Sequence, residues 1–431
     1  MPGSRSISSS QASSWWIVGK QLVVALVVLQ AGCFTAAPSK RVRTGAEVLA
    51  ARHFDLLRGK RVGLITNHTA RIDTMHLIDR LMAEPEVHLV ALFAPEHGLR
   101  GTAAAGEEIR DGRDVRTGLP VYSLYGATRK PTPEMLADLD VLVFDIQDVG
   151  ARCYTYISTM GLAMQAAAEA GIPFVVLDRP NPLGGELISG FVLEPAQTSF
   201  VGLYPIPLVY GLTIGELAQL IRGEQLLPGL EHLELIVVPM EGWQRAMQWP
   251  DTQLPWRSPS PNLPSFEAAL AYPGTVFFEA VDGSEGRGTD APFLQVGTRW
   301  ANARALADTL NAHQLPGVRF EPVSFVPQPR PGAPHPRYEG ERLQGVRLRI
   351  TDRRQFRPVV TGIYLLHAFY HQAPPAYRET FIQRPAWLAR LAGTERLYAL
   401  LKAGASPEAI VAAWEADLRA FQQQRQPYLL Y

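Results

Sequence analysis

The sequence is poor in cysteine and has no surplus of charge of either sign. Cys33 and Cys153 are the two cysteines among 431 residues, and 41 basic residues balance 41 acidic ones. Cys33 falls in an N-terminal segment that we predict below to be an export signal. Cys153 is therefore left without an internal disulfide partner, and stability has to come from packing. The balanced charge, without a basic stripe, argues against nucleic acid as a partner.

Motifs for cofactors are also missing. Where a dinucleotide fingerprint would follow the first predicted strand, the sequence reads Thr66-Asn67-His68-Thr69 and has no glycine. There is no P-loop and no G-x-S-x-G elbow, and no H-x-x-x-H or paired-cysteine spacing links His68, His97 and Asp145 into a metal site. We therefore expect a protein without NAD, metal or other cofactor.

The N-terminal segment has an apolar run that is short for a membrane span. Gln21–Leu29 fits the hydrophobic region of a secretory signal. Gln30-Ala31-Gly32-Cys33 is similar to a bacterial lipoprotein cleavage box, although Gln30 stands where an aliphatic residue is preferred. We expect residues 1–35 to be an export signal and Cys33 to be lipidated, which would hold the protein at the periplasmic side of the cell envelope. An ordinary signal peptide or an uncleaved anchor is the alternative.

Strand and helix patterns alternate over residues 45–262, and the apolar residues of Ile72–Met82 have helical spacing. One helix shows a capping box, with Thr213 as N-cap and Glu216 three residues later. The alternation predicts βαβ units, that is, an α/β fold with a Rossmann-like parallel sheet covered by helices on both faces. After a crossover rich in Pro and Trp, residues 263–431 predict a smaller α+β domain. Its first strand is expected at Thr275–Val281.

Four apolar runs of the first domain end in polar residues. Leu89–Ala94, for example, leads directly into Pro95-Glu96-His97-Gly98. Because the carboxyl ends of parallel strands meet at one edge of a sheet, we expect the four ends to form a site. Taken singly, each acid would be read as an ion-pair partner or an N-cap. The polar residues at the four ends are Asn67 and His68; Glu96 and His97; Asp145, Gln147 and Asp148; and Asp178, Arg179 and Asn181.

A second polar group lies in the loop 279–289, where Glu285 and Arg287 alternate with glycines. This loop could close over the edge of the sheet from the other domain. Aromatic residues such as Tyr154 are close to the strand ends in sequence. Paired carboxylates can cleave a glycosidic bond, and aromatic rings stack on the apolar faces of sugars. The pattern therefore favours a carbohydrate as the substrate.

Five blocks of sequence carry a specific resemblance. They are similar, in the same order, to the exo-β-N-acetylmuramidase family, and the resemblance extends from about Val62 to the C-terminus. The blocks are Gly63–Ala70, Leu92–Gly101, Val143–Tyr156, Leu177–Gly185 and Ser284–Thr289.

The resemblance implies removal of N-acetylmuramic acid from the non-reducing ends of peptidoglycan fragments, in a cleft between the two domains. By analogy, Glu96 is the general acid/base. We expect Asp145 to be the second carboxylate, with Asp148 and Glu285 as rivals. Substrate contacts are expected from His97 and Tyr154, from Arg152, Arg179 or Arg287 to the lactyl carboxylate, and from Asn67, Gln147 or Asn181 to the acetamido group.

Two other functions stay open at this stage. An esterase or amidase acting on cell-wall material could use His97 or Cys153 as its reactive group. A non-catalytic lipoprotein could hold muropeptides without cleaving them.

Overall fold

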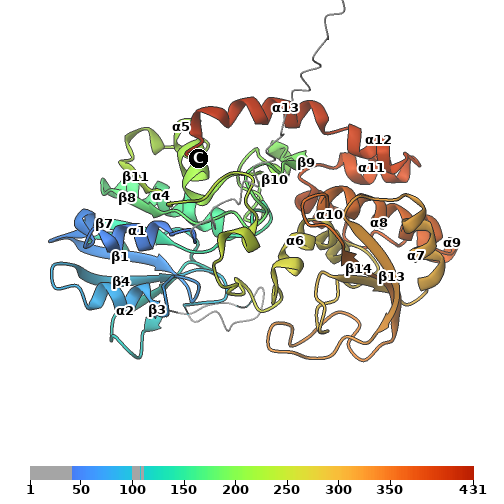
Figure 1. The fold of residues 1–431 in the computed structure, drawn as a ribbon, viewed down its shortest axis with the longest axis horizontal. Helices are drawn as coiled ribbons and strands as arrows, with labels where there is room; N and C mark the ends of the chain where they lie inside the picture. Colours follow the sequence, from blue (N-terminus) through green and yellow to red (C-terminus); the bar gives the residue numbers. More distant parts are fainter. Residues whose placement is uncertain (1–40, 100–106, 108–110) are drawn as a thin grey trace, which may run out of the picture. The chain divides into compact units, whose positions relative to one another are not determined.

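The computed structural model describes residues 41–99, 107 and 111–431. The described residues, from Arg41 onward, belong to one compact unit (Figure 1). The boundary expected near residue 262 stays a prediction, and the expected export signal and Cys33 lie outside the described residues. None of the described helices has the length and apolarity needed to cross a bilayer.

The first half of this unit, which we take as residues 41–262, is built on a seven-stranded sheet, and residues 263–431 form the second half. Six neighbouring strands are parallel, and β5 is antiparallel at one edge. The four central strands are almost entirely buried, as parallel strands covered on both faces are. In spatial order the strands are β11 (Leu235–Val238), β8 (Phe174–Leu177), β7 (Val141–Asp145), β1 (Arg61–Thr66), β4 (His88–Ala94), β6 (Pro120–Ser123) and β5 (Gly112–Arg113).

Helices cover both faces of the sheet. On one face, α1 (Gly45–Ala51) and α2 (Leu77–Met82) pack on alternate apolar residues of the strands. On the other face lie α3 (Pro133–Leu136), α4 (Tyr156–Ala170) and α5 (Ile214–Gly223). The capping box expected for α5 is present. Thr213 Oγ1 accepts a hydrogen bond from the Glu216 N–H, and the Glu216 carboxylate accepts one from the Thr213 N–H. The predicted Rossmann-like sheet is confirmed.

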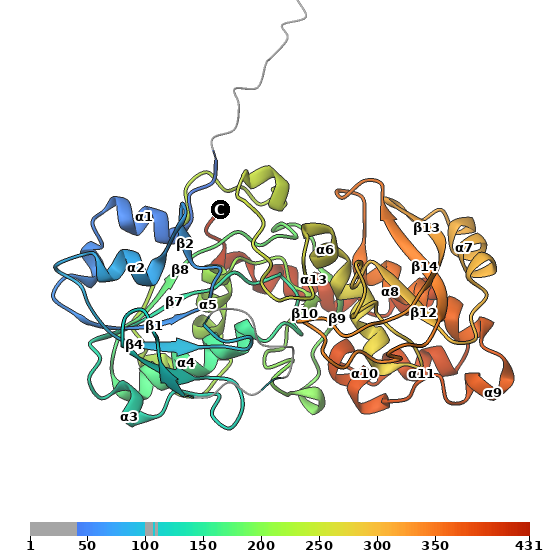
Figure 2. The same ribbon diagram turned by 90° about the horizontal axis from the view of Figure 1, so that it is seen from below.

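The second half is smaller and mixed. Its sheet is antiparallel, in the order β12 (Gln295–Thr298), β14 (Leu343–Ile350), β13 (Val318–Phe325), and helices surround it (Figure 2). The predicted α+β part is therefore confirmed. The helices are α6 (Phe266–Thr275), α7 (Ala303–Ala312), α8 (Pro358–Gln372), α9 (Pro375–Arg378), α10 (Pro385–Ala392), α11 (Arg396–Lys402), α12 (Pro407–Ala412) and α13 (Glu415–Gln424).

The C-terminal segment joins the two halves. Helix α13 packs on β9 (Ser189–Val192), which pairs with β10 (Pro207–Val209). Just beyond α13, Tyr431 donates a hydrogen bond of 2.7 Å to Asp178 at the end of β8. One buried apolar cluster runs through both halves, so they share a core.

Two predicted elements were wrong. Thr275–Val281 is not a strand, because the chain continues from α6 into a 3₁₀ helix over Val276–Ala280. The run is apolar and buried nearly all round, and such a short run does not separate strand from helix by periodicity. The apolar residues of 72–82 were spaced like one helix, but the hairpin β2 (Arg71–Ile72) to β3 (Met75–His76) precedes α2.

Candidate active site

A cavity of about 580 Å³ lies where the two halves meet, and we call it the main cavity. One wall comes from the first half of the chain. The end of β4 supplies Glu96 and His97, and the loop that follows β7 supplies Thr155. The opposite wall comes from the second half, through α6, the loop 279–293, the segment 332–337 and α10. Its volume lies within the range of ordinary ligand pockets.

Glu96 is held at the end of β4 by a tight turn. Its side chain is half-buried, and Oε2 accepts a 2.7 Å hydrogen bond from Thr155 Oγ1. His97 and Gly98 follow with φ of 69° and 72°, and the Gly98 N–H closes the turn on the Pro95 carbonyl. A left-handed histidine is uncommon and marks a strained turn of the kind that gathers at functional sites. Burial, together with the charge of Glu96 and a hydrogen bond to it, raises the pKa of Tyr125.

Two more carboxylates share one guanidinium across the cavity from Glu96. Arg287 Nη1 lies 2.7 Å from Glu279 Oε1 and 2.8 Å from Glu285 Oε1, and its guanidinium stacks over Phe293. Burial opposes the charge of Arg287, but the two carboxylates outweigh burial and raise the pKa of Arg287. Glu285 is 4% exposed, and its Oε2 has no hydrogen-bond partner in the described structure.

A cation and an aromatic ring from α10 complete this wall. The exposed Arg384 stacks over the Trp387 ring at 5.2 Å, and Trp387 Nε1 donates to Glu279 Oε2 at 3.1 Å. Arg384 makes no ion pair with any carboxylate that the structure describes. The cavity therefore presents three carboxylates and three guanidinium groups. Arg287 is paired with two of the carboxylates, Arg337 donates to backbone carbonyls, and Arg384 is available to an anion.

The predicted site residues fall into separate groups. Five of them line the main cavity: Glu96, His97, Tyr154, Glu285 and Arg287. The others lie at the same edge of the sheet, but their side chains point into the protein or into a different pocket. The residues of the main cavity that the sequence did not single out include Tyr125, Thr155, Asn262, His335, Arg384 and Trp387.

Asp145 does not line the main cavity. Its carboxylate is fully buried and forms a two-pronged ion pair with Arg179, at 2.5 and 3.0 Å. Both Asp145 oxygens are engaged in this pair, and the pairing leaves Arg179 little charge for a lactyl group. The geometry therefore gives no support to Asp145 as the partner of Glu96.

Asp148 is also buried, in a polar contact of its own. Its Oδ2 accepts hydrogen bonds from the Gly150 N–H at 2.7 Å and from the Tyr210 hydroxyl at 2.5 Å, while Oδ1 has no partner in the described structure. Burial raises the pKa of Asp148 to about 7, against the opposing effect of these hydrogen bonds. This acid belongs to the core and does not reach the main cavity.

The raised pKa of Asp148 predicts a pH-dependent stability. Between about pH 4 and pH 7 the unfolded chain has lost a proton that folded Asp148 keeps, so stability falls as the pH rises through this window. Asp148→Asn removes this titration. Relative to the wild type, its free energy of unfolding should be about 2–3 kcal/mol greater at pH 8 than at pH 5, because only the wild type loses stability over this range. Urea unfolding of the wild type and the variant at pH 5 and pH 8 measures this change. The same difference in free energy of unfolding between the two proteins at both pH values would contradict the prediction.

Three further predicted contacts are structural. The Asn67 side chain donates to the Tyr156 hydroxyl and accepts from Thr69. Asn181 donates to the Leu212 carbonyl. Arg152 is fully buried and bonded to three backbone carbonyls. None of these side chains lines the main cavity, so the geometry gives no support to substrate contacts from them there.

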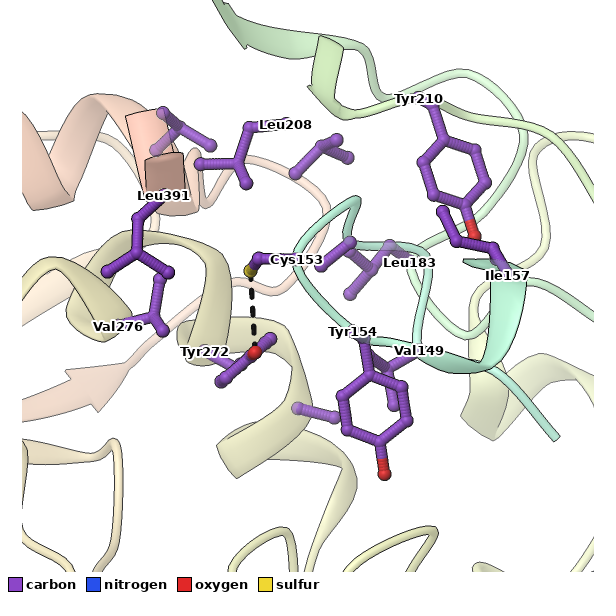
Figure 3. Packing of buried hydrophobic residues seen from close by; sticks show 14 of the residues in the cluster. Val149, Cys153, Tyr154, Ile157, Leu183, Leu208, Tyr210, Tyr272, Val276 and Leu391 are labelled. Carbon is purple, nitrogen blue, oxygen red and sulfur yellow. Dashed lines mark hydrogen bonds between the residues drawn. The ribbon is translucent and has the colours of Figure 1, made fainter. Parts of the chain in front are cut away.

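Cys153 is poorly suited to act as a nucleophile. It lies at the floor of the main cavity among Leu208, Val276 and Leu391, and its thiol donates to the Tyr272 hydroxyl at 3.3 Å (Figure 3). Burial raises the pKa of Cys153 to about 11. Since the thiolate is the reactive form, this environment argues against thiol chemistry at neutral pH. Among the residues described, no group of three or more His, Cys, Asp or Glu side chains could hold a metal ion.

The fold is that of an α/β enzyme, and the carboxylates of the main cavity are typical of a glycosidase. The family models described as exo-beta-N-acetylmuramidase NamZ match this chain, the N-terminal model over residues 62–267 and the C-terminal model over residues 270–431. The chain belongs to this family and is an exo-acting glycosidase.

Individual relatives agree with the family models. The peptidoglycan beta-N-acetylmuramidase NamZ of Bacillus subtilis is 45% identical over 397 residues, which are 92% of each chain. The crystal structure of a DUF1343 family protein from Bacteroides fragilis matches with a TM-score of 0.82 and 41% identity, over 91% of this chain and 99% of the other. A second such protein matches with a TM-score of 0.74 and 33% identity, over 90% and 99%. The resemblance read from the sequence is confirmed.

Proposed function

We propose that this protein removes β-linked N-acetylmuramic acid from the non-reducing ends of peptidoglycan fragments, and that it does so in the main cavity. The observation that carries the location is the meeting of Glu96 with Glu279 and Glu285 in one cavity. The substrate is supported by the activity for which the Bacillus subtilis relative is named. No cofactor is needed, because carboxylates alone can cleave a glycosidic bond.

Glu96 is the general acid/base in this proposal. Its half-buried carboxyl faces the cavity from the end of a rigid buried strand, and Thr155 orients one of its oxygens. The carboxyl lines the cavity, and a carboxyl in a partly dry cleft can donate its proton to a leaving group bound there.

Glu285 is the second carboxylate that we propose, in place of Asp145. Its Oε1 is fixed by Arg287, and its buried Oε2 has no partner in the described structure. A fixed, unsatisfied acceptor in the same cavity as Glu96 can stabilise the developing charge of the sugar or orient its acetamido group. Glu279 has both oxygens engaged, by Arg287 and Trp387, which suits a positioning role.

The proposal is tested with a chromogenic β-N-acetylmuramide and the corresponding β-N-acetylglucosaminide. The wild-type protein should release the aryl group from the muramide with time and act on the glucosaminide far more slowly. Binding of the muramide without release would favour a muropeptide-binding protein. Release from a chromogenic ester but not from the muramide would favour an esterase.

We assign the lactyl carboxylate to Arg384, because Arg287 is already neutralised by two glutamates. Loss of a charge-assisted hydrogen bond costs about 1.5–3 kcal/mol. Arg384→Gln should therefore weaken inhibition by free N-acetylmuramic acid about ten- to a hundredfold, and leave inhibition by N-acetylglucosamine unchanged.

Arg390→Gln, at an exposed position of the same helix outside the cavity, serves as the control for Arg384→Gln and should behave as the wild type. Inhibition constants against muramide turnover provide the measurement. Equal losses for the two sugars would assign Arg384 to the general architecture of the cavity and remove it from lactyl recognition.

We also propose that the protein is exported and held at the cell envelope by a lipid on Cys33. The apolar segment Gln21–Leu29 and the box that ends in Cys33 support this proposal. Cys33→Ser should abolish labelling by a radioactive fatty acid and move the protein from the membrane to the soluble fraction. A wild-type protein that is soluble and unlabelled would identify the segment as a plain signal peptide.

A further inference from the structure

A second cavity, of about 310 Å³, lies at the carboxyl edge of the same sheet, and we call it the arginine pocket. It shares no lining residue with the main cavity. The loops that follow β1, β7 and β8 form one wall, and a segment from the crossover forms the other. These walls include Thr69 and Arg71, Gln147, Arg179, and the segment 249–257.

The arginine pocket occupies the point where the strand order reverses. From β1 the chain adds β4 and β6 on one side, and then returns to add β7, β8 and β11 on the other side. The reversal therefore falls between β1 and β7, and the loops after these two strands line the pocket. In open α/β sheets this crevice is where ligands bind. The main cavity instead uses the end of β4 and the loop after β7.

Positive charge is in excess in the arginine pocket. Arg41 is paired with Glu47, and Arg179 with Asp145. Arg71 and Arg257 also line the pocket, and neither is within ion-pair distance of a carboxylate in the part of the chain that the structure describes.

Their guanidinium groups donate instead to backbone carbonyls at positions 73 and 74. Burial and the nearby charges of Arg71 and Arg179 lower the pKa of Arg257, as expected for guanidinium groups gathered without a counter-ion. The second acid that lines the pocket, Asp73, lies 3.5 Å from Arg41, and its side chain is 79% exposed to solvent, where its charge is screened.

Two buried polar atoms of the pocket residues lack partners. Gln147 is 3% exposed, and its amide nitrogen donates to the carbonyls of Asp148 and Pro180, but its Oε1 accepts no described hydrogen bond. Trp249 is 6% exposed, and its Nε1 donates none. Buried polar groups normally find partners, so one acceptor and one donor among the lining residues, one on each wall, indicate a missing ligand with both kinds of group.

We propose that the arginine pocket binds a hydroxylated anion of monosaccharide size, with the anionic group on Arg71 and Arg257 and a hydroxyl on Gln147 Oε1. A volume of about 310 Å³ is at the small end of ligand pockets and excludes a dinucleotide. No glycine-rich loop follows β1, and the Thr69 N–H is taken by Asn67 Oδ1. The charge is therefore read by guanidinium forks, which match carboxylate and phosphate alike.

Isothermal titration calorimetry of the purified protein with glucuronate, glucose 6-phosphate and glucose tests this proposal. The wild type should bind at least one of the two anions and should not bind glucose; the tighter of the two identifies carboxylate or phosphate as the recognised group. Arg257→Met should weaken that binding at least about tenfold, and Arg384→Gln, in the main cavity, should not change it. Failure of the wild type to bind either anion, or a loss caused by Arg384→Gln and not by Arg257→Met, would overturn the proposal.

A crystal soak of the wild-type protein with the same two anions gives a second measurement that does not depend on the stability of a variant. The proposal expects density between the guanidinium groups of Arg71 and Arg257. An empty arginine pocket in soaked crystals, at concentrations where calorimetry reports binding, would contradict it. Neither experiment depends on muramide hydrolysis, so the two proposals can fail separately.

Discussion

Glu96→Gln should lower kcat on a β-linked muramyl disaccharide by about 10²–10⁴, as loss of a general acid does. The carboxamide keeps the shape of the side chain and can still accept the hydrogen bond from Thr155 Oγ1, which is 2.7 Å from the native carboxylate. The carboxamide has no acidic proton to transfer to the leaving oxygen. With an aryl leaving group, which needs little protonation, the loss in the bond-breaking step should be smaller.

The contrast between the two leaving groups separates acid catalysis from a structural role of Glu96. Glu267→Gln is the matched control, because Glu267 is exposed on α6 and does not line the main cavity. It should retain wild-type turnover. Wild-type kcat for Glu96→Gln on the disaccharide would remove Glu96 from the mechanism and leave it as the end of a buried strand.

Arg152→Met should reduce the free energy of unfolding by about 3–5 kcal/mol, because three buried carbonyls lose their donor. Arg152 is fully buried, and its guanidinium donates to Phe191, Ile206 and Leu391 at 2.8–3.0 Å. The first two carbonyls belong to the first half of the chain, and the third belongs to α10 in the second half. The side chain therefore ties the floor of the main cavity to its far wall.

Urea unfolding of Arg152→Met, with the slope against urea unchanged, measures this loss. Arg390→Gln, an exposed substitution on the same α10, should stay within about 0.5 kcal/mol of the wild type. A loss below about 1 kcal/mol for Arg152→Met would mean that water replaces the guanidinium at the three carbonyls.

The sequence was most informative where structure is decided locally. The capping box of Thr213 and Glu216 correctly predicted where α5 begins, because its two hydrogen bonds join residues three apart. The end of β4 was located correctly too, since an apolar run that stops at Glu96 is a feature of neighbouring residues. Val276–Ala280 shows the limit, because its helical conformation depends on packing that surrounds a short apolar run on all sides.

The arrangement of the site was beyond local patterns. The ends of parallel strands meet at one edge as expected, but the sequence could not say that Asp145 would be taken by Arg179, 34 residues away. It also could not show that this edge carries two separate cavities. Arg384 and Trp387 reach the main cavity from a helix nearly 290 residues after Glu96. Only the meeting of the two halves brings them there, and an isolated Arg and Trp on a helix give no signal of it.

The most direct measurement is the crystal structure of the Glu96→Gln variant soaked with a β-1,4-linked disaccharide of N-acetylmuramic acid and N-acetylglucosamine. We predict that the muramyl ring lies in the main cavity, with its lactyl carboxylate against Arg384. The glycosidic oxygen should lie within about 3.2 Å of the carboxamide at position 96, the reach of a general acid. A disaccharide bound in the arginine pocket, or one whose glycosidic oxygen is out of reach of position 96, would contradict the account.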